Sequence, residues 1–354
     1  MDFNEIQPYG LRQLEKERLL LSELSRLVKW HQGSCTEYKK LLTALDFSSA
    51  DFQSLESLPF LPVRLFKHHD LLSIPPGEVV KTMVSSGTTG QNVSRIFLDK
   101  QTSGLQVKIL SKIVSEFIGP KRLPMLIIDC KATVADRYKF SARTAGILGF
   151  SIFGRDVEYA LNDDMSLDLD RVTAFIQKYQ GEKILIFGFT FIVWKHLVLQ
   201  LESLQTNLDL QNSILIHGGG WKQMLSESVG NPEFKERLQS MCGLSKVHNF
   251  YGMVEQTGSI FMECEMGNLH TSAFSDVLFR NPVDFSVLGN GVPGLIQLLS
   301  VIPHSYPGHS LLSEDIGELG GTDDCPCGRG GKHFKVHGRI QNAEVRGCSD
   351  TYSR

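Results

Sequence analysis

Leucines recur at helical spacing among Glu, Lys and Arg between residues 11 and 48. This pattern predicts two amphipathic helices with a break near Gly33. Short apolar runs follow at residues 124–128, 183–187 and 213–216, and longer stretches of helical periodicity separate them. Because buried strands that alternate with helices are typical of α/β proteins, the middle of the chain predicts an α/β sheet.

The pattern changes twice outside that region. Pro59 and Pro62 stand too close together for a helix, so this segment is expected to be extended. Beyond Gly267 the chain is rich in Gly, Pro and short apolar pairs, as in residues 291–296. This composition predicts an antiparallel or barrel-like β subdomain.

Composition narrows the function classes. The chain has 354 residues, of which 42% are hydrophobic, enough for a large core. Its 36 basic and 39 acidic residues are spread along the chain and give a formal charge of −3. Such a balance provides no broad basic field for a nucleic-acid backbone, so no polynucleotide partner is expected.

Targeting signals and cysteine usage bear on the compartment. The N-terminus lacks the basic patch and apolar run of a secretory signal. The most apolar stretch, residues 184–194, is only 11 residues long, which predicts a strand running into a helix and no transmembrane segment. Seven irregularly spaced cysteines favour a reducing compartment over a disulfide framework, so a cytoplasmic location is expected.

A loop dense in hydroxyls and glycines is the strongest local signal. Its members are Ser85, Ser86, Gly87, Thr88, Thr89 and Gly90. Glycines let backbone N–H groups turn inward, and hydroxyls add donors without bulk, so the loop can wrap phosphate oxygens. A Walker loop would carry a lysine where Gln91 stands. The alternative is a flexible surface loop.

This loop resembles the phosphate-binding signature of the acyl-adenylate-forming superfamily, which includes acyl-CoA ligases. A second segment resembles the superfamily's Tyr-Gly-x-x-Glu motif through Tyr251, Gly252 and Glu255. The resemblance implies that the tyrosine stacks on adenine and that the glutamate binds Mg²⁺. Taken alone, Tyr251 could equally be a core residue and Glu255 part of a solvated face.

Three further segments follow the superfamily's order. Gly218, Gly219 and Gly220 follow an apolar run, and the resemblance implies that they line the adenine and acyl pockets; the alternative is a tight turn. Asp315 stands where the superfamily has an aspartate that accepts hydrogen bonds from both ribose hydroxyls. Arg339 stands in a segment similar to the hinge motif, which implies contact with ribose and phosphate; Gln341 replaces its usual acidic residue.

Two subfamilies compete for a closer resemblance. The segment 59–67, the segment 217–222 and the C-terminus resemble the acyl-protein synthetase of the bacterial fatty acid reductase complex that feeds bioluminescence. Cys325 to Arg329, with Glu263 and Cys264, resemble phenylacetate-CoA ligases. Either resemblance implies the adenylate-forming N-terminal domain, an α/β fold of two sheets sandwiched by helices plus a small β-rich subdomain. Only a short tail stands where most members of the superfamily have a full C-terminal domain of about a hundred residues, so that domain is expected to be lacking.

The resemblance divides the chain into three regions. Residues 1–50 form a helical lead-in, residues 51–336 form the adenylate-forming domain with its β-rich part from about residue 267, and residues 337–354 form a hinge-like tail. In the synthetase the acyl group moves to a cysteine close to the C-terminus, which implies this role for Cys348. Neighbouring Arg346 would favour the reactive thiolate. The alternative is an incidental tail cysteine.

Four other residues form a candidate metal set: Cys264, His270, Cys325 and Cys327. Soft thiolates with one imidazole are the ligands of a four-coordinate structural Zn²⁺. Phenylacetate-CoA ligases carry a similar set. The alternative places Cys264 in the core and leaves the other two cysteines free in a loop.

The sequence therefore predicts an acid–thiol ligase. ATP and Mg²⁺ are expected between the loop at Gly87 and Tyr251, where a carboxylic acid, expected to be a fatty acid, becomes acyl-AMP. Thr88 and Glu255 would stabilise charge on the phosphates. Cys348, CoA or a carrier protein would accept the acyl group, and the synthetase resemblance implies assembly with an acyl reductase. The alternatives are an aryl- or acyl-CoA ligase and a noncatalytic nucleotide-binding subunit.

Overall fold

The computed structural model describes residues 3, 5–47, 52–85, 93–135, 142–221 and 228–339. The contacts between residues divide the chain into two compact units. The first unit contains the described residues up to Glu116 and those from Gly252 onward. The second unit contains the described residues from Phe117 to Tyr251.

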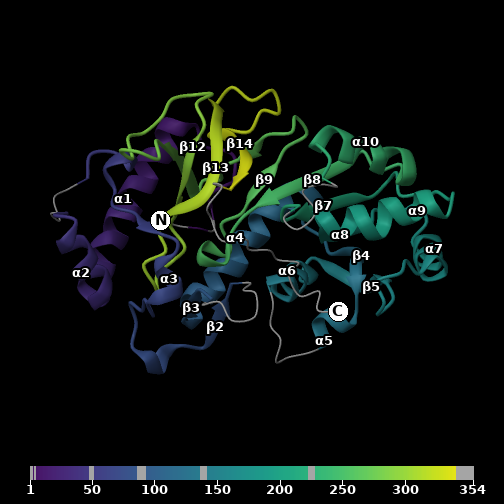
Figure 1. Ribbon diagram of the computed structural model, residues 1–354, viewed down its shortest axis with the longest axis horizontal. Helices are drawn as coiled ribbons and strands as arrows, with labels where there is room; N and C mark the ends of the chain where they lie inside the picture. The colour runs from purple at the N-terminus through teal and green to yellow at the C-terminus, as the bar shows by residue number, and fades with distance from the viewer. Residues whose placement is uncertain are drawn as a thin grey trace. The chain divides into compact units, whose positions relative to one another are not determined.

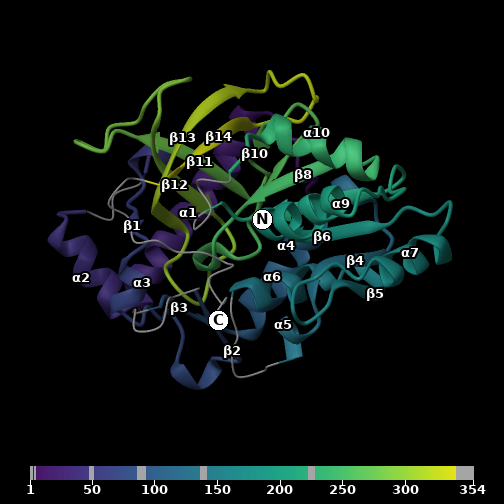
Figure 2. The same cartoon turned by 45° about the vertical axis from the view of Figure 1, so that its right-hand side comes forward.

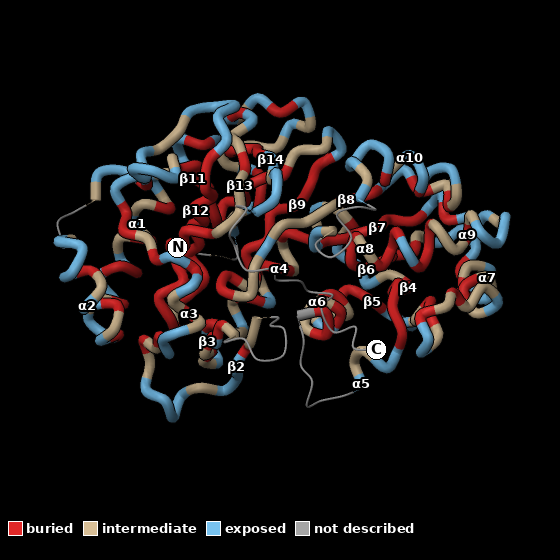
Figure 3. Tube along the Cα trace, viewed as in Figure 1, coloured by how far each residue is buried: buried red, intermediate tan, exposed pale blue. Residues whose placement is uncertain are grey.

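The second unit is built on a parallel sheet with the strand order β8–β7–β6–β4–β5 (Figure 1). Its strands are β4 (Leu123–Cys130), β5 (Gly154–Leu161), β6 (Leu185–Phe189), β7 (Ile214–Gly218) and β8 (Lys246–Tyr251). All residues of β6 and β7 are buried, and the central strands are red in Figure 3. Burial on both faces is the reason that these segments read as continuous apolar runs.

Helices cover both faces of this sheet (Figure 2). They are α5 (Ala132–Ala135), α6 (Ala142–Ser151), α7 (Leu169–Lys178), α8 (Thr190–Val193), α9 (Leu199–Ser203) and α10 (Asn231–Cys242), with a π-helical turn, Trp194–Val198, between α8 and α9. Phe150 of α6 stacks on Phe187 of β6 with ring centroids 4.4 Å apart. Phe234 of α10 packs at 4.7 Å against His217, whose neighbours in β7 face the other way.

The first unit contains an antiparallel sheet with the order β11–β12–β13–β14–β10–β9 (Figure 1). Its strands are β9 (Phe261–Glu263), β10 (Leu269–His270), β11 (Ser275–Arg280), β12 (Gly294–Ser300), β13 (Ser310–Thr322) and β14 (Lys332–Arg339). The short strand β1 (Leu61–Pro62) adds to β13 in parallel. A separate hairpin pairs β2 (Lys81–Val84) with β3 (Arg95–Leu98).

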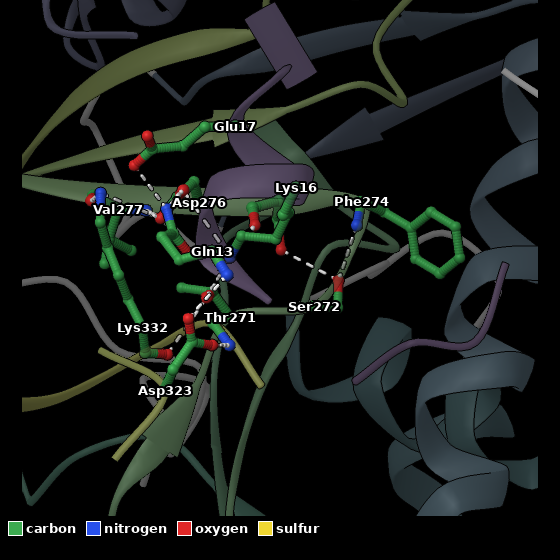
Figure 4. A network of polar contacts seen from close by, with 12 residues as sticks. Gln13, Lys16, Glu17, Thr271, Ser272, Phe274, Asp276, Val277, Asp323 and Lys332 are labelled. Carbon is green, nitrogen blue, oxygen red and sulfur yellow. Dashed lines mark hydrogen bonds and ion pairs between the residues drawn. The ribbon is translucent and has the colours of Figure 1, made fainter. Parts of the chain in front are cut away.

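The helices of the first unit are α1 (Gln13–Ser34), α2 (Thr36–Ala44), α3 (Leu65–His68) and α4 (Lys100–Ile118). α1 buries Leu20, Leu24 and Leu27 completely, at the three- and four-residue spacing of one helix face. Its start is fastened to the β-rich part by a buried polar network (Figure 4). Lys16 Nζ lies 3.7 Å from Asp276 Oδ2, and Gln13 Nε2 donates to the same oxygen at 2.7 Å.

Several predictions from the pattern are confirmed. The two N-terminal helices meet at Cys35, close to the expected break, and the three apolar runs form β4, β6 and β7. The segment after Gly267 is antiparallel, and the proline segment is extended as β1. Within the described ranges, no helix combines the length and the apolar character that crossing a membrane requires. The division at residues 50 and 336 stays a prediction.

Candidate functional site

The second unit brings two of the predicted segments to one edge of its sheet. Gly218 ends β7 and Tyr251 ends the neighbouring strand β8. The two strands run parallel, with Gly218 opposite Phe250. In α/β sheets ligands bind outside the carboxyl ends of the strands, so this edge is the place where a ligand is expected.

The glycines at this edge are required by packing. A Cβ atom on Gly218 would lie 2.4 Å from Cε1 of Phe250, well inside van der Waals contact. Gly219 has a φ of +80°, a conformation that side chains disfavour. The Phe250 ring thus fills the space beside Gly218, which is buried, whereas Gly219 is exposed and leaves the chain after β7 as backbone without a side chain, which a flat ligand can approach closely. Gly220 follows and is exposed.

Thr190 and His217 fix the direction of this backbone. The Thr190 hydroxyl donates to the Gly218 carbonyl at 3.2 Å and lies 2.9 Å from His217 Nδ1. Because a hydroxyl has one proton, the His217 Nδ1–H must then donate to the hydroxyl oxygen. Burial lowers the pKa of His217 to about 3, so the ring is neutral. Sequence reasoning missed Thr190, since nothing in its surroundings marks it.

Tyr251 is half-buried at the end of β8, and the chain passes into the first unit directly after it. In that unit Glu255 lies in a 3₁₀ turn, Val254–Gln256, and is only 3% exposed. The Tyr306 hydroxyl donates to its backbone carbonyl at 2.9 Å. Sequence reasoning also missed Gln256, whose amide donates to the carbonyls of Leu298 and Gly308 and pins the turn.

Asp315 and Arg339 are brought together by the pairing of β13 with β14. They are direct cross-strand neighbours, and Arg339 Nε donates to Asp315 Oδ1 at 3.2 Å. Their side chains are 15% and 31% exposed, so both remain accessible from solvent. The two residues that the sequence singled out 24 positions apart therefore form one charged pair.

The predicted phosphate loop is described only at its first residue. Ser85 follows β2, its N–H donates to the Ser94 carbonyl at 3.0 Å, and its hydroxyl accepts from the Ser94 N–H at 2.9 Å. These bonds close the β2–β3 hairpin across the base of the loop. The other loop residues and the predicted acyl-carrying cysteine lie outside the described residues: Ser86, Gly87, Thr88, Thr89, Gly90 and Cys348.

The four predicted metal ligands come together in the first unit. Their ligand atoms all lie within 4.8 Å of one another, and the residues are Cys264, His270, Cys325 and Cys327. The sulfurs of Cys264 and Cys325 are 3.9 Å apart, and Cys327 Sγ lies 3.3 Å from His270 Nε2. Zinc–sulfur bonds of about 2.3 Å in a tetrahedron place two sulfurs about 3.8 Å apart, which matches this spacing.

The fold explains how residues about 60 positions apart meet at this cluster. Cys264 and His270 flank the turn between β9 and β10, while Cys325 and Cys327 lie in the connection from β13 to β14. β10 pairs with β14, with His270 opposite His333. Burial lowers the pKa of His270 to about 4, so its imidazole is neutral, the form that binds a metal.

Comparisons with known proteins identify the family of the chain. A family model described as "Acyl-protein synthetase, LuxE" matches residues 3–354. A "Long-chain-fatty-acid--luciferin-component ligase" of Vibrio harveyi is 23% identical, over 93% of this chain and 87% of that protein. The ligase of the same name from Aliivibrio fischeri is 21% identical, over 85% of this chain and 79% of that protein.

Solved structures establish the fold. A 2-hydroxyisobutyryl-CoA ligase in an open conformation, in complex with 2-HIB-AMP and CoA, has a TM-score of 0.72 at 16% identity, over 97% of this chain and 81% of that chain. A long-chain-fatty-acid-CoA ligase from Archaeoglobus fulgidus gives 0.50 at 14% identity, over 75% of this chain and 53% of that chain. The expected α/β fold of adenylate-forming ligases is confirmed.

Proposed function

Because the chain belongs to the acyl-protein synthetase family, we propose that it activates a long-chain fatty acid with ATP and transfers the acyl group to a thiol. The observation that carries this proposal is the pair of exposed glycines, Gly219 and Gly220, which follows β7 beside the aromatic end of β8. Both curated relatives are ligases of long-chain fatty acids by name, which supports the choice of substrate.

Each described site residue has a role in this proposal. The ring of Tyr251 stacks on adenine, and the glycine backbone lies against the nucleotide. Asp315 accepts hydrogen bonds from the ribose hydroxyls, and Arg339 balances its charge and approaches the phosphates. Glu255 holds the Mg²⁺ that offsets the triphosphate charge once the nucleotide is bound.

The chemistry proceeds in two transfers. A carboxylate oxygen of the fatty acid attacks the α-phosphorus of ATP, an oxygen–phosphorus bond forms, and pyrophosphate leaves. The protein contributes positioning and electrostatic stabilisation, to which the hydroxyls of the loop at Ser85–Thr89 add donors. A thiolate then attacks the acyl carbonyl of the mixed anhydride and AMP leaves with the bonding electrons. We assign the thiolate to Cys348.

Pyrophosphate exchange tests the first transfer. Labelled pyrophosphate should enter ATP only when a long-chain fatty acid is present, and the absence of acid-dependent exchange would refute the proposal. Cys348→Ala tests the second transfer, because it should abolish labelling of the protein by radioactive fatty acid and leave exchange nearly normal. If the variant still accepts label, or if CoA is the product-forming thiol in both proteins, Cys348 is not the acceptor.

We also propose that the cysteine–histidine cluster binds a structural Zn²⁺. Three thiolates and one neutral imidazole fill a tetrahedral shell completely, so no coordination position remains for substrate. Three of the four residues are buried, and Arg329 forms an ion pair with Glu265 beside them. The metal would join the β9–β10 turn to the β13–β14 connection and so stabilise the part of the chain that carries Asp315 and Arg339.

A further inference from the structure

Strand β13, which carries Asp315, pairs irregularly with β12 next to that residue. Against β12, Gln297 pairs with Leu312 and Leu295 pairs with Ile316. Three residues of β13, Ser313 to Asp315, therefore lie opposite the single residue between Leu295 and Gln297. Such a bulge bends the strand and changes the direction of its side chains, and bulges recur beside active sites.

Two strands share the other edge of β13 around this bulge. β1 pairs in parallel with Leu311 and Leu312, and the Val63 N–H donates to the Leu312 carbonyl at 2.9 Å. The pairing with β14 begins at Asp315, opposite Arg339. Along β13, the acidic residues Glu314 and Asp315 thus lie where the pairing with β1 ends and the pairing with β14 begins.

An arginine from each of these strands holds one of the two carboxylates. Arg64, two residues after β1, forms a close ion pair with Glu314, and Arg339 pairs with Asp315. The Glu314 side chain is only 10% exposed, whereas Arg64 is 51% exposed. Adjacent carboxylates repel one another, so the cation on Glu314 offsets the repulsion that would turn the Asp315 carboxylate away from its position beside Arg339.

We propose that Arg64 is a positioning residue for the ribose site, an inference that rests on the proposed role of Asp315. By holding Glu314 at the end of β1, it fixes the bulge and thereby the direction of the Asp315 carboxylate. Because the Arg64 side chain is half exposed, the ion pair contributes little to stability through its charge alone, and we place its effect in the direction of the neighbouring carboxylate. The segment 59–67, singled out by its sequence, thereby acquires a function: it builds β1 and supplies Arg64.

The test compares ATP with 2′-deoxy-ATP in fatty-acid-dependent pyrophosphate exchange. Arg64→Met should raise the KM for ATP about three- to tenfold, the size of a coupling between neighbouring groups, and change the KM for 2′-deoxy-ATP much less. The preference for ATP should therefore fall. Glu314→Gln should have the same effect, the double variant should add nothing to either single one, and Arg64→Lys should retain part of the preference. Arg155→Met removes an arginine of similar exposure from its ion pair with Glu182, in the other unit, and should leave the preference unchanged.

Two results would overturn the proposal. An equal rise in KM for both nucleotides would show that Arg64 contacts the phosphates. A loss of stability toward urea with an unchanged preference would show a merely structural pair. If the unmodified protein catalyses no exchange, the proposed function itself is wrong, and this outcome is distinct from both.

Discussion

The packing of Phe250 over Gly218 gives a prediction whose size follows from the structure. In Gly218→Ala, the new Cβ would lie 2.4, 2.6 and 2.8 Å from three ring carbons of Phe250, so the ring must retreat by about 1 Å to reach an ordinary contact. The ring cannot retreat freely, because it also packs against Phe150, with ring centroids 5.0 Å apart, and against Phe187, at 6.5 Å. Overpacking of this kind costs about 1–3 kcal/mol.

Urea unfolding followed by circular dichroism measures that cost, and pyrophosphate exchange measures the KM for ATP in the same variant. We expect a lower unfolding midpoint and a higher KM, since the displaced ring lies next to Tyr251. Gly149→Ala is the matched control: it lies in α6 of the same unit, a Cβ there meets nothing within 4 Å, and it should stabilise by about 0.5–1 kcal/mol. Adding Phe250→Leu to Gly218→Ala should recover part of the lost stability, because the smaller side chain leaves room for the new Cβ. If Gly218→Ala equals the unmodified protein in both assays, the reasoning about this edge is wrong.

Three further predictions concern the rest of the molecule. Burial lowers the pKa of His309 to about 3, far below the value of about 6.5 in the unfolded chain, so its contribution to stability is complete above pH 6.5 and is lost as pH falls toward 3. His309→Phe should reduce the dependence of the unfolding free energy on pH by up to about 1.4 kcal/mol per pH unit, measured by urea unfolding between pH 4 and 7. An unchanged pH dependence would contradict this prediction. Elemental analysis of the purified protein should find about one zinc per chain. Cys264→Ser should lower the zinc content, whereas Cys242→Ser should not, and equal zinc in both variants would exclude the cysteine–histidine cluster as the zinc site. Arg143→Met should lower the free energy of unfolding in urea by about 3–5 kcal/mol, because the buried Asp129 carboxylate loses its ion-pair partner. Adding Asp129→Leu should recover part of this loss, and additive losses in the double variant would refute the explanation.

The sequence predicted those parts of the fold that depend on local pattern. The runs that became β4, β6 and β7 are apolar because both faces of that sheet are buried, so period and length identified them. Asp315 and Arg339 could be singled out by resemblance, but their contact depends on the register of β13 with β14, which no local pattern encodes.

The remaining features depend on contacts distant in the sequence. Thr190 was missed because a hydroxyl at the start of a helix is common, and only the neighbouring strand places a histidine and a carbonyl beside it. The bulge around Glu314 was missed because it is a mismatch in length between two strands. The loop at Gly87 and the tail at Cys348 remain predictions, since they lie outside the described residues.

The buried network at Lys16 also has a consequence for the order in which the protein matures. α1 is synthesised before Asp276, whose carboxylate accepts the hydrogen bond from Gln13 and which is 263 residues further along the chain. At 5–20 residues per second, translation takes roughly 10 to 50 s to supply that partner. Until then the buried contacts of Gln13 and Lys16 with Asp276 cannot form. Completion of this network therefore waits for the synthesis of β11, whatever local structure α1 has reached before.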